Sequence, residues 1–306
     1  MLAADEHGIA VAAELLRAGR IVAVPTETVY GLAGDAGNPL AVAGIYAGKG
    51  RPDFNPLIVH VPNRGKAAAI AQFDSLADRL AQAFWPGPLT LVLPLAKNAP
   101  ITAAVTAGLG TIALRCPAHP AMRALLEKSE LFLAAPSANR SGGISPTRAS
   151  HVTASLGDKV PLVLDGGACI AGLESTIVAV RDTGWQILRP GPVTLEAIEA
   201  VAGSAPLPLH DVKIEAPGQL VSHYAPAKPV RLSVTVPHAD EWHIGFGATE
   251  GDDNLSPDGD LAEAAARLFD ALHRADASTK QRIAIAAVPE TGIGVAINDR
   301  LRRAAA

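Results

Sequence analysis

The sequence predicts two α/β units joined by a long connector. Short β-branched or leucine-rich runs alternate with helical stretches up to about residue 202, which indicates an α/β or α+β domain with a twisted sheet. Five prolines and two glycines then break this alternation between residues 203 and 229. Because this connector is too long for an ordinary loop, we divide the chain into a first domain over 1–202, a linker over 203–229 and a C-terminal domain over 230–306.

The strands and helices of the first domain follow from short apolar runs and from helix caps. Each predicted strand is bounded by glycine or proline, and each predicted helix has a cap or apolar residues at helical spacing. We expect strands at about 21–24, 57–61, 89–94, 111–115, 131–135, 162–164, 175–180 and 185–189. We expect helices at about 7–19, 38–48, 75–84, 118–127, 147–155 and 194–201.

The C-terminal domain shows the order strand, strand, helix, strand, helix. The strands are VRLSV, WHIGFG and RIAIAAVP, and the helices are LAEAAARLFDALHRAD and GIGVAINDRLRRAAA. This order predicts a small α/β domain with a parallel sheet. The GFG at residues 245–247 lacks the spacing of a dinucleotide-binding fingerprint, and we interpret the acidic residues 250–260 as a solvated loop.

Composition predicts a soluble protein with an aliphatic core. Of its 306 residues 49% are apolar but only 4% are aromatic, so aliphatic side chains and alanine must fill the core. Cys116 and Cys169 match no metal or redox spacing, and we expect two reduced core thiols in a cytoplasmic protein. The N-terminus does not fit a secretory signal, and no apolar run is long enough for a membrane span.

The distribution of charge disfavours direct binding of nucleic acid. Residues 1–230 hold 18 basic and 18 acidic residues, whereas residues 231–306 hold 8 basic and 12 acidic residues. Neither part has the basic excess of a protein that binds nucleic acid through its phosphates. We therefore expect no stable complex with tRNA.

The stretch between residues 24 and 61 predicts a binding site. An apolar strand runs into the hydroxyl-rich turn PTET at residues 25–28, and a capped helix follows. Gly48 lies near the end of this helix, which delivers Lys49 and Arg51 to the loop before the next strand. One strand end thus carries hydroxyls and the other carries cations. We expect both to face one cleft that binds an anion.

Longer motifs around this stretch resemble one family. PTETVYGLAGDA together with KGRPDFNPLIVHV resembles the signature of the YrdC-like threonylcarbamoyl-AMP synthases. SHYAP at 222–226 is similar to the linker of the longer, two-domain members. Further pieces follow in the family's order: FWPGPLTLVLP at 84–94, TIALRCP at 111–117, APSANRSGGISPT at 135–147, LDGG at 164–167, GLESTIV at 172–178 and LRPG at 188–191.

The resemblance implies a fold and an activity. The fold is a twisted, mixed open sheet with a concave, positively charged cavity, followed by the linker and a small Rossmann-like α/β domain. The enzyme is an ATP-dependent nucleotidyltransferase that makes L-threonylcarbamoyladenylate from L-threonine, bicarbonate and ATP, with release of pyrophosphate. Its product serves the threonylcarbamoyladenosine modification of tRNA, so downstream tRNA threonylcarbamoyl-transfer proteins are the implied partners.

Two cations and a glycine-rich loop are candidates for binding phosphate. Lys49 and Arg51 can neutralise a triphosphate, with a solvated helix end as the alternative reading. The loop APSANRSGGISPT can wrap phosphate oxygens with backbone N–H groups, with a surface loop as the alternative; no Walker A motif occurs in the chain. By resemblance Lys49 and Arg51 are catalytic, and Tyr224 folds over the nucleotide. The implied ATP contacts are Arg51, Asn55, Thr111, Ser137, Ser145, Arg189 and Tyr224.

A second set of residues suits an amino acid. Arg115 ends the apolar strand TIALR, where a desolvated cation needs an anion, either a substrate carboxylate or an internal Asp or Glu. His60 lies inside LIVHV, where a core histidine with satisfied hydrogen bonds is the alternative. By resemblance the threonine-binding residues are Thr28, His60, Arg115, Ala135 through its backbone, and Ser175.

The implied mechanism depends on charge neutralisation. The carbamate that attacks ATP is already an anion, so no strong general base is required. We expect Mg²⁺ to be held through the ATP phosphates without a direct protein ligand, and Asp35 and Glu27 to be indirect contacts.

Two other functions stay open from the sequence. A carbamoyl-handling enzyme of the hydrogenase-maturation type would also contain a similar domain, but the chain shows none of the acylphosphatase-like or zinc-finger segments of those proteins. A non-catalytic RNA-binding module would bind tRNA in a salt-dependent way, which the charge balance argues against. The oligomeric state and the role of the C-terminal domain, in gating the cavity or in association, also stay open.

Overall fold

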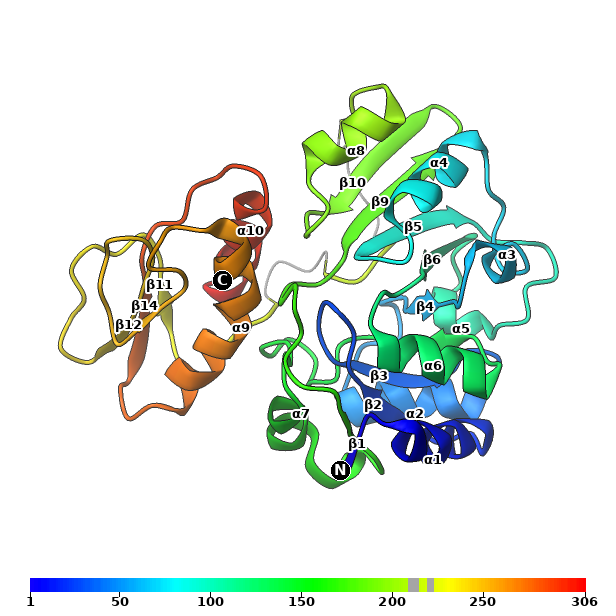
Figure 1. Ribbon diagram of the computed structural model, residues 1–306, viewed down its shortest axis with the longest axis horizontal. Coiled ribbons are helices and arrows are strands. Elements are labelled where there is room, and N and C mark those ends of the chain that lie inside the picture. Colours follow the sequence, from blue (N-terminus) through cyan, green and yellow to red (C-terminus); the bar gives the residue numbers. More distant parts are fainter. Residues whose placement is uncertain (209–214, 219–222) are drawn as a thin grey trace.

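Two α/β units make up the protein, each with its own sheet (Figure 1). The structure is a computed structural model and describes residues 1–208, 215–218 and 223–306. The strands of the first unit are β1 (Leu2–Ala3), β2 (Val22–Val24), β3 (Gly31–Asp35), β4 (Ile58–His60), β5 (Leu89–Pro94), β6 (Thr111–Arg115), β7 (Leu133–Ala134), β8 (Leu164–Asp165), β9 (Thr176–Arg181) and β10 (Gly184–Arg189). Its helices are α1 (Glu6–Arg17), α2 (Pro39–Lys49), α3 (Arg64–Ala67), α4 (Ser75–Phe84), α5 (Ala103–Thr106), α6 (Pro120–Ser129), α7 (Ala149–Leu156) and α8 (Leu195–Ala202).

Eight of these strands form a mixed sheet in the order β10-β9-β5-β6-β4-β7-β3-β2, while β1 pairs with β8. Strand β4 runs parallel to β6, and β5 runs parallel to β9, whereas the other neighbours are antiparallel. The parallel register pairs His60 with Arg115. The mixed sheet implied by the family resemblance is therefore confirmed, and it brings two predicted site residues side by side.

Helices cover both faces of the large sheet. Successive residues of a strand point to opposite faces, so Leu32 of β3 joins one core cluster and Ala33 joins another. The first cluster contains the fully buried Trp185, and the second forms where α1 packs on α6. Alanine and aliphatic residues dominate both clusters, as the low aromatic content predicts.

Local capping residues set the ends of the site helix α2. The Asn38 side chain accepts hydrogen bonds from two backbone N–H groups of the first turn. At the other end Gly50, with φ of 62°, is the left-handed C-cap, whereas Gly48 is a buried residue inside the helix. Within the described part of the chain, no helix is long and apolar enough to cross a membrane.

Strand β3 is the main element that the sequence analysis missed. Residues 31–35 form this strand, where the sequence analysis expected a turn that leads into a helix. The segment GLAGD contains two glycines and no β-branched residue, so it lacks the usual strand composition. Its first four residues are buried within the sheet, which explains why small side chains are suitable there.

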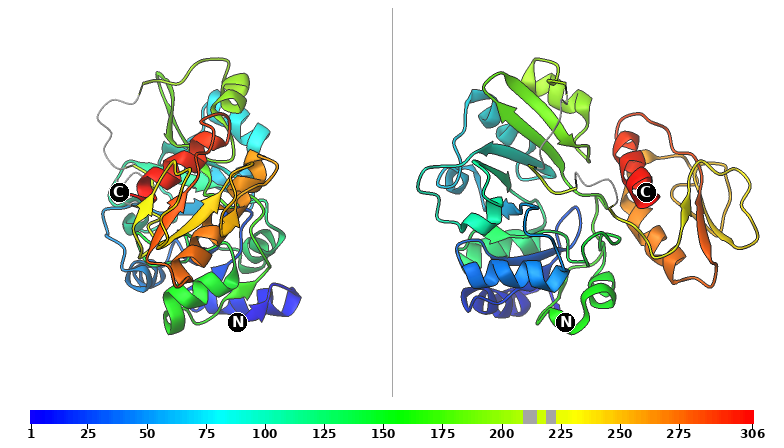
Figure 2. Two further views of the ribbon diagram at one scale, coloured as in Figure 1. Left: turned by 90° about the vertical axis from the view of Figure 1, so that its left-hand side faces the viewer. Right: turned by 180° about the vertical axis from the view of Figure 1, so that it is seen from behind.

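The second unit is a parallel sheet with two helices. Its strands are β11 (Val230–Arg231), β12 (Glu241–Gly245), β13 (Asp253–Asn254) and β14 (Arg282–Ile285), and its helices are α9 (Leu261–Ala277) and α10 (Gly294–Ala304). The strand order is β11-β14-β12-β13, and all three pairs are parallel. The predicted parallel sheet is confirmed. Both helices lie between this sheet and the first unit (Figures 1 and 2).

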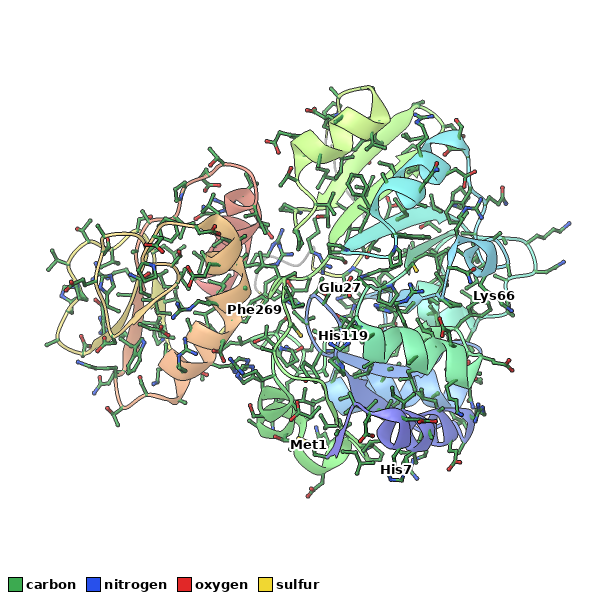
Figure 3. The ribbon with its side chains drawn as sticks, viewed as in Figure 1. Met1, His7, Glu27, Lys66, His119 and Phe269 are labelled. Carbon is green, nitrogen blue, oxygen red and sulfur yellow. The ribbon has the colours of Figure 1, made fainter. Side chains whose placement is uncertain are left out.

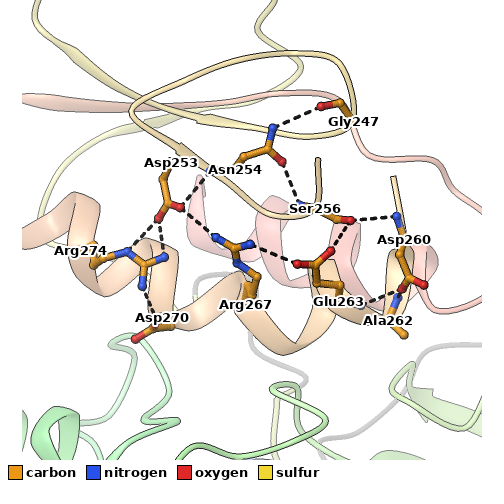
Figure 4. Close-up of polar contacts among 10 residues, drawn as sticks. All are labelled: Gly247, Asp253, Asn254, Ser256, Asp260, Ala262, Glu263, Arg267, Asp270 and Arg274. Atoms are coloured by element: carbon orange, nitrogen blue, oxygen red, sulfur yellow. Dashed lines mark hydrogen bonds and ion pairs between the residues drawn. The ribbon is translucent and has the colours of Figure 1, made fainter. Parts of the chain in front are cut away.

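The interpretation of residues 250–260 as a solvated loop holds for the exposed residues of this segment but is wrong for residues 253–256. Asp253 in β13 lies 2.5 Å from Arg274 Nη2 and 3.5 Å from Arg267 Nη2, both on α9 (Figure 4). The Ser256 hydroxyl donates to Glu263 Oε2 at 2.6 Å. Asp253 is therefore fixed to basic side chains of the next helix, a pairing that the acidic composition of the segment does not reveal.

The core of the second unit continues into the first. Val29, Ile144 and Leu173 of the first unit belong to the same buried cluster as Phe269 and its neighbours on α9. Part of the linker predicted at 203–229, including Ser222 of SHYAP, lies outside the described residues. The division at residues 202 and 229 remains a prediction.

Gly172 brings the two units into close contact. Its φ is 65°, and a Cβ added there would lie 2.5 Å from the backbone of Ala265 and Ala266 on α9. Contacts below 3.0 Å with backbone atoms cannot be relieved by a side-chain rotation. Only glycine therefore allows the loop before β9 to approach α9 this closely.

Gly172→Ala should move the two units apart and lower the thermal stability of the protein. We expect a larger radius of gyration in small-angle X-ray scattering and a lower Tm than in the wild type. Gly203→Ala is the matched control, because its φ of 73° imposes similar backbone strain but no atom lies within 4 Å of the added Cβ. The close-contact argument fails if both variants keep the wild-type radius of gyration.

Candidate functional site

A small cavity lies where the large sheet, its loops and the linker meet. Its volume is about 50 Å³, space for about one or two water molecules. The predicted site residues among its lining are Thr28, Arg51, His60, Arg115, Ala135, Ser137, Ser175, Arg189 and Tyr224. The other lining residues are Thr26, Val29, Gly31, Ile58, Pro136, Glu174, Pro217, Gly218 and His223. The expectation that the hydroxyl-rich and the cationic strand ends face one cleft is confirmed.

The threonines of the PTET turn form a chain of hydroxyl groups. The Thr26 hydroxyl donates to the Val29 carbonyl at 2.6 Å and lies 2.8 Å from the Thr28 hydroxyl. Thr28 Oγ1 in turn accepts a hydrogen bond from Arg115 Nη1 at 2.8 Å. The turn therefore fixes one edge of the Arg115 guanidinium on the cavity wall (Glu27, in the same turn, is labelled in Figure 3).

Arg115 also makes the internal salt bridge that the sequence analysis left open. Its Nη2 lies 2.7 Å from Glu27 Oε1, and its Nε donates to the Gly87 carbonyl at 3.2 Å. Burial disfavours the ionised form of Glu27, but the charge and hydrogen bond of Arg115 hold the pKa of this carboxyl below its ordinary value. Since a guanidinium has five N–H donors, these bonds leave donors for a second anion in the cavity.

His60 is a neutral imidazole on the cavity wall. The side chain is buried, and burial together with the nearby Arg115 lowers its pKa to about 3. Its Nδ1 has no hydrogen-bond partner in the described residues. A core histidine with satisfied hydrogen bonds, the alternative from the sequence, is therefore not what the structure contains. This nitrogen is itself buried, so it is an unsatisfied polar group beside the cavity.

Two further buried guanidinium groups line the cavity. Arg51 donates to the carbonyls of Asn55 and Pro56 at 3.1 and 2.8 Å, and Arg189 donates through Nη2 to the Ser175 carbonyl at 2.9 Å. These carbonyl oxygens fix the groups in place without cancelling their charge. Burial lowers the pKa of Arg51 to about 10, so it remains a cation at neutral pH. The cavity wall is thus suited to an anion.

Lys49 lies behind this wall. Its Nζ donates to the carbonyls of Ser137 and Asn139 at 2.5 and 2.6 Å, and the residue does not line the cavity. Burial, with the charge of Arg51, lowers the pKa of Lys49 well below its ordinary value. Lys49 therefore holds the loop that presents Ser137 to the cavity.

Three other predicted site residues do not line the cavity in this structure. Asn55 is buried after the loop that carries Arg51, and its side-chain amide has no partner among the described residues. Thr111 begins β6, where it pairs with Pro94. Ser145 is buried, and its hydroxyl donates to Glu174 Oε1.

Glu174 is the site residue that sequence reasoning missed. It is buried and lines the cavity, and it contacts Ser145 and Arg300 of α10. The GLESTIV motif contains it, but a carboxylate is not expected in a wall built for anions. The ion pair with Arg300, which is far away in the sequence, explains why a carboxylate is buried at this position.

Residues of the predicted linker form part of the cavity wall. Tyr224 has φ of 65°, is almost fully buried, and lies 5.7 Å from Phe269 of α9 between ring centroids. Its hydroxyl lacks a partner among the residues described. His223 beside it has its pKa lowered to about 3 by burial, with Lys49 and Arg51 acting in the same direction. Two linker residues with neutral aromatic side chains, His223 and Tyr224, therefore lie against the cationic cavity.

The two cysteines play no part in the cavity. Cys116 and Cys169 are free and buried, as predicted for core thiols. Burial raises the pKa of Cys169 to about 12 and also raises that of Cys116. Neither thiol is therefore activated as a nucleophile.

Lowering the pH from 7 to 5 should destabilise the fold, and His60 should account for part of the loss. The pKa of His60 is about 3 in the folded state and 6.5 ordinarily. Between these two pH values the unfolded state therefore binds more protons than the folded state, so the free energy of unfolding decreases as the pH is lowered. The expected loss at pH 5 is about 2 kcal/mol. Urea unfolding at both pH values should show a smaller loss for His60→Gln; an equal loss would contradict this account.

Comparisons with known proteins match both units. A Sua5, YciO and YrdC family model, described as telomere recombination, matches residues 14–191. A second, described as threonylcarbamoyl-AMP synthase, C-terminal domain, matches residues 193–306.

Two individual relatives match over nearly the whole chain, and a third matches the first unit and little more. Threonylcarbamoyl-AMP synthase of Bacillus subtilis is 40% identical, with 99% of this chain and 94% of the relative covered. Pyrococcus abyssi Sua5 complexed with L-threonine has a TM-score of 0.89 and 36% identity, over 98% of this chain and 95% of that one. A putative threonylcarbamoyl-AMP synthase of Mycobacterium tuberculosis H37Rv, 36% identical, covers 64% of this chain and 90% of its own length. The chain belongs to the threonylcarbamoyl-AMP synthase family.

Proposed function

We propose that this chain makes L-threonylcarbamoyladenylate from L-threonine, bicarbonate and ATP, with release of pyrophosphate, for the threonylcarbamoyladenosine modification of tRNA. The observation that carries the proposal is the wall of the cavity. Arg51 and Arg189 line the same small volume as the corner formed by Arg115 and Thr28. The first pair suits phosphate, and the corner suits an amino acid carboxylate.

The threonine subsite is proposed at the Arg115 corner. Some N–H groups of Arg115 are not used by its contacts within the protein, and these donate to the carboxylate of threonine. His60 and Ser175 offer neutral polar groups. Thr28 and the Ala135 backbone complete the proposed subsite, and all five residues line the cavity. The P. abyssi relative, whose structure is described as a complex with L-threonine, supports this assignment.

The triphosphate subsite is proposed beside Arg51, Arg189 and Ser137. Lys49 contributes by holding the loop of Ser137 from behind. Asn55, Thr111 and Ser145 stay proposed nucleotide contacts, although they do not line the cavity in this structure. Tyr224, which does line the cavity, is proposed to fold over the bound nucleotide.

The chemistry follows from these positions. The amine of threonine and bicarbonate combine to a carbamate with loss of water, and a carbamate oxygen attacks the α-phosphorus of ATP. The bond between the α-phosphorus and the bridging oxygen breaks, and pyrophosphate leaves. Because the attacking group is an anion, the protein mainly neutralises charge, through Arg51 and Arg189, and excludes water from the mixed anhydride.

Magnesium is proposed to arrive with ATP, held through its phosphates. Across the described residues, no group of three or more His, Cys, Asp or Glu side chains gathers as a metal site. Glu27 is paired with Arg115, and Asp35 Oδ1 accepts from the Gly37 N–H at 2.8 Å. Both carboxylates predicted as indirect metal contacts therefore already have partners.

The proposed cellular setting follows from the thiols and the charge balance. Two free, buried thiols suit the reducing cytoplasm. The even charge of the first unit disfavours a stable complex with tRNA, so the labile adenylate passes to downstream tRNA threonylcarbamoyl-transfer proteins.

Purified protein should release pyrophosphate from MgATP only when L-threonine and bicarbonate are both present. Arg51→Met should raise the KM for ATP by about tenfold or more, because it removes a charged hydrogen-bond donor from the phosphate subsite. Arg20→Met is the control, since Arg20 is exposed and outside the cavity. Release without threonine, or no release together with salt-sensitive tRNA binding, would contradict the proposal and favour an RNA-binding module.

Arg115→Lys should raise the KM for L-threonine by about tenfold and leave the KM for ATP within about twofold. Lysine keeps the charge, but it cannot contact Thr28, Glu27, the Gly87 carbonyl and a substrate carboxylate at once. Steady-state kinetics with each substrate varied in turn separate the two constants. Equal rises in both constants would show that the corner is not a threonine subsite.

A further inference from the structure

The second unit places a buried arginine behind the wall of the cavity, in contact with the lining residue Glu174. Arg300 on α10 has no exposed surface. Its Nε donates to Glu174 Oε2 at 2.7 Å and its Nη2 to the Pro190 carbonyl at 3.0 Å, so the side chain reaches from the second unit into the first. Asp299 Oδ2 lies 2.7 Å from its Nη1. A cation buried this completely requires partners, and Glu174 is the one that belongs to the cavity.

Glu174 is the only carboxylate among the described lining residues of the cavity, beside Arg51, Arg115 and Arg189. Burial opposes its ionisation, but Arg300, Arg189 and the Ser145 hydroxyl hold the pKa of this carboxyl below its ordinary value. Glu174 is therefore an anion at neutral pH. An anion in the wall repels a phosphate ligand and competes with it for cations.

Arg189 is the cation for which Glu174 competes. Arg189 is bonded to the backbone and hydroxyl of Ser175, the residue next to Glu174. Glu174 and Arg189 line the same cavity, so their opposite charges lie around one small volume. Each of these charges favours the ionised form of the other. If Arg300 withdraws, the Glu174 carboxylate has Arg189 as its remaining charged partner at the cavity.

The loop around Ser145 is held by the same unit. His273 of α9 lies with Nε2 at 3.1 Å from the Ser145 carbonyl, and the Ser145 hydroxyl donates to Glu174. The Ala225 N–H of the linker donates to the Gly142 carbonyl at 2.8 Å. Glu174 and this loop are thus braced together when the second unit is docked.

We propose that Arg300 is a positioning residue for the nucleotide. It holds Glu174 away from Arg189, and so keeps that cation available to the phosphates of ATP. Docking of the C-terminal unit thereby sets the nucleotide affinity of the first unit. The inference rests on the proposed function, because it takes MgATP to be the ligand of the cavity.

The test is a double-mutant cycle on the full chain, with MgATP binding measured by calorimetry and the KM for ATP by pyrophosphate release. Arg300→Met should weaken MgATP binding by about tenfold, because it frees the Glu174 carboxylate. Glu174→Gln should tighten binding by about two- to fivefold, since it removes an anion from the wall. The double variant should return to within about threefold of the wild type, because the competing anion is gone.

A merely structural ion pair predicts the opposite pattern. Each single variant would then weaken binding, and the double variant would be at least as weak as Arg300→Met; this result would overturn the inference. Arg302→Met is the control on the same helix, because Arg302 is exposed and pairs with Glu290 away from the cavity. Arg300→Lys, which keeps the charge, should retain more of the affinity than Arg300→Met.

Two measurements keep the result interpretable. If Arg300→Met does not fold by circular dichroism, the Glu174→Gln variant decides, since weaker MgATP binding by that variant contradicts the inference. If the wild type binds no MgATP, the proposed function fails and the inference fails with it. If the wild type binds MgATP but the double variant does not regain affinity, the inference is overturned and the proposed function is not.

Discussion

The structure depends on several cations held out of water around one small volume. Arg51, Arg115 and Arg189 line the cavity and Lys49 lies behind it, and each is at most 8% exposed. Desolvating like charges together is unfavourable, so each group is fixed by carbonyl, hydroxyl or carboxylate oxygens. These bonds set the position of every charge before a ligand arrives. An anionic substrate then meets donors that need no rearrangement, which is the condition for electrostatic catalysis.

The arrangement of strands brings the charges together. The parallel register of β4 and β6 places His60 beside Arg115, and the PTET turn after β2 supplies the hydroxyls that hold it. Lys49, the last residue of α2, points into the protein, and the left-handed Gly50 then turns the chain before Arg51, which lines the cavity. Two basic residues separated by one glycine thus have different surroundings: Lys49 bonds the loop of Ser137, and Arg51 lies on the cavity wall.

Sequence patterns predict most of the helices and strands and the cavity residues that stand in motifs. They fail at β3, where burial among neighbours replaces strand propensity, and at β13, which is fixed by ion pairs to the next helix. The direction of Lys49 follows from how α2 packs on the protein, because Lys49 is the last residue of this helix, and composition does not specify that packing. Glu174 and Arg300 are 126 residues apart, so their pairing follows from docking of the two units and from no local pattern.

The shared apolar core has a consequence for shorter forms of this protein. Val29, Ile144 and Leu173 of the first unit are buried only as members of a cluster with α9 residues. A fragment that ends before the linker would expose these three side chains to solvent as an apolar patch near the cavity, which favours aggregation. In the full chain the C-terminal unit keeps this apolar surface of the first unit out of water.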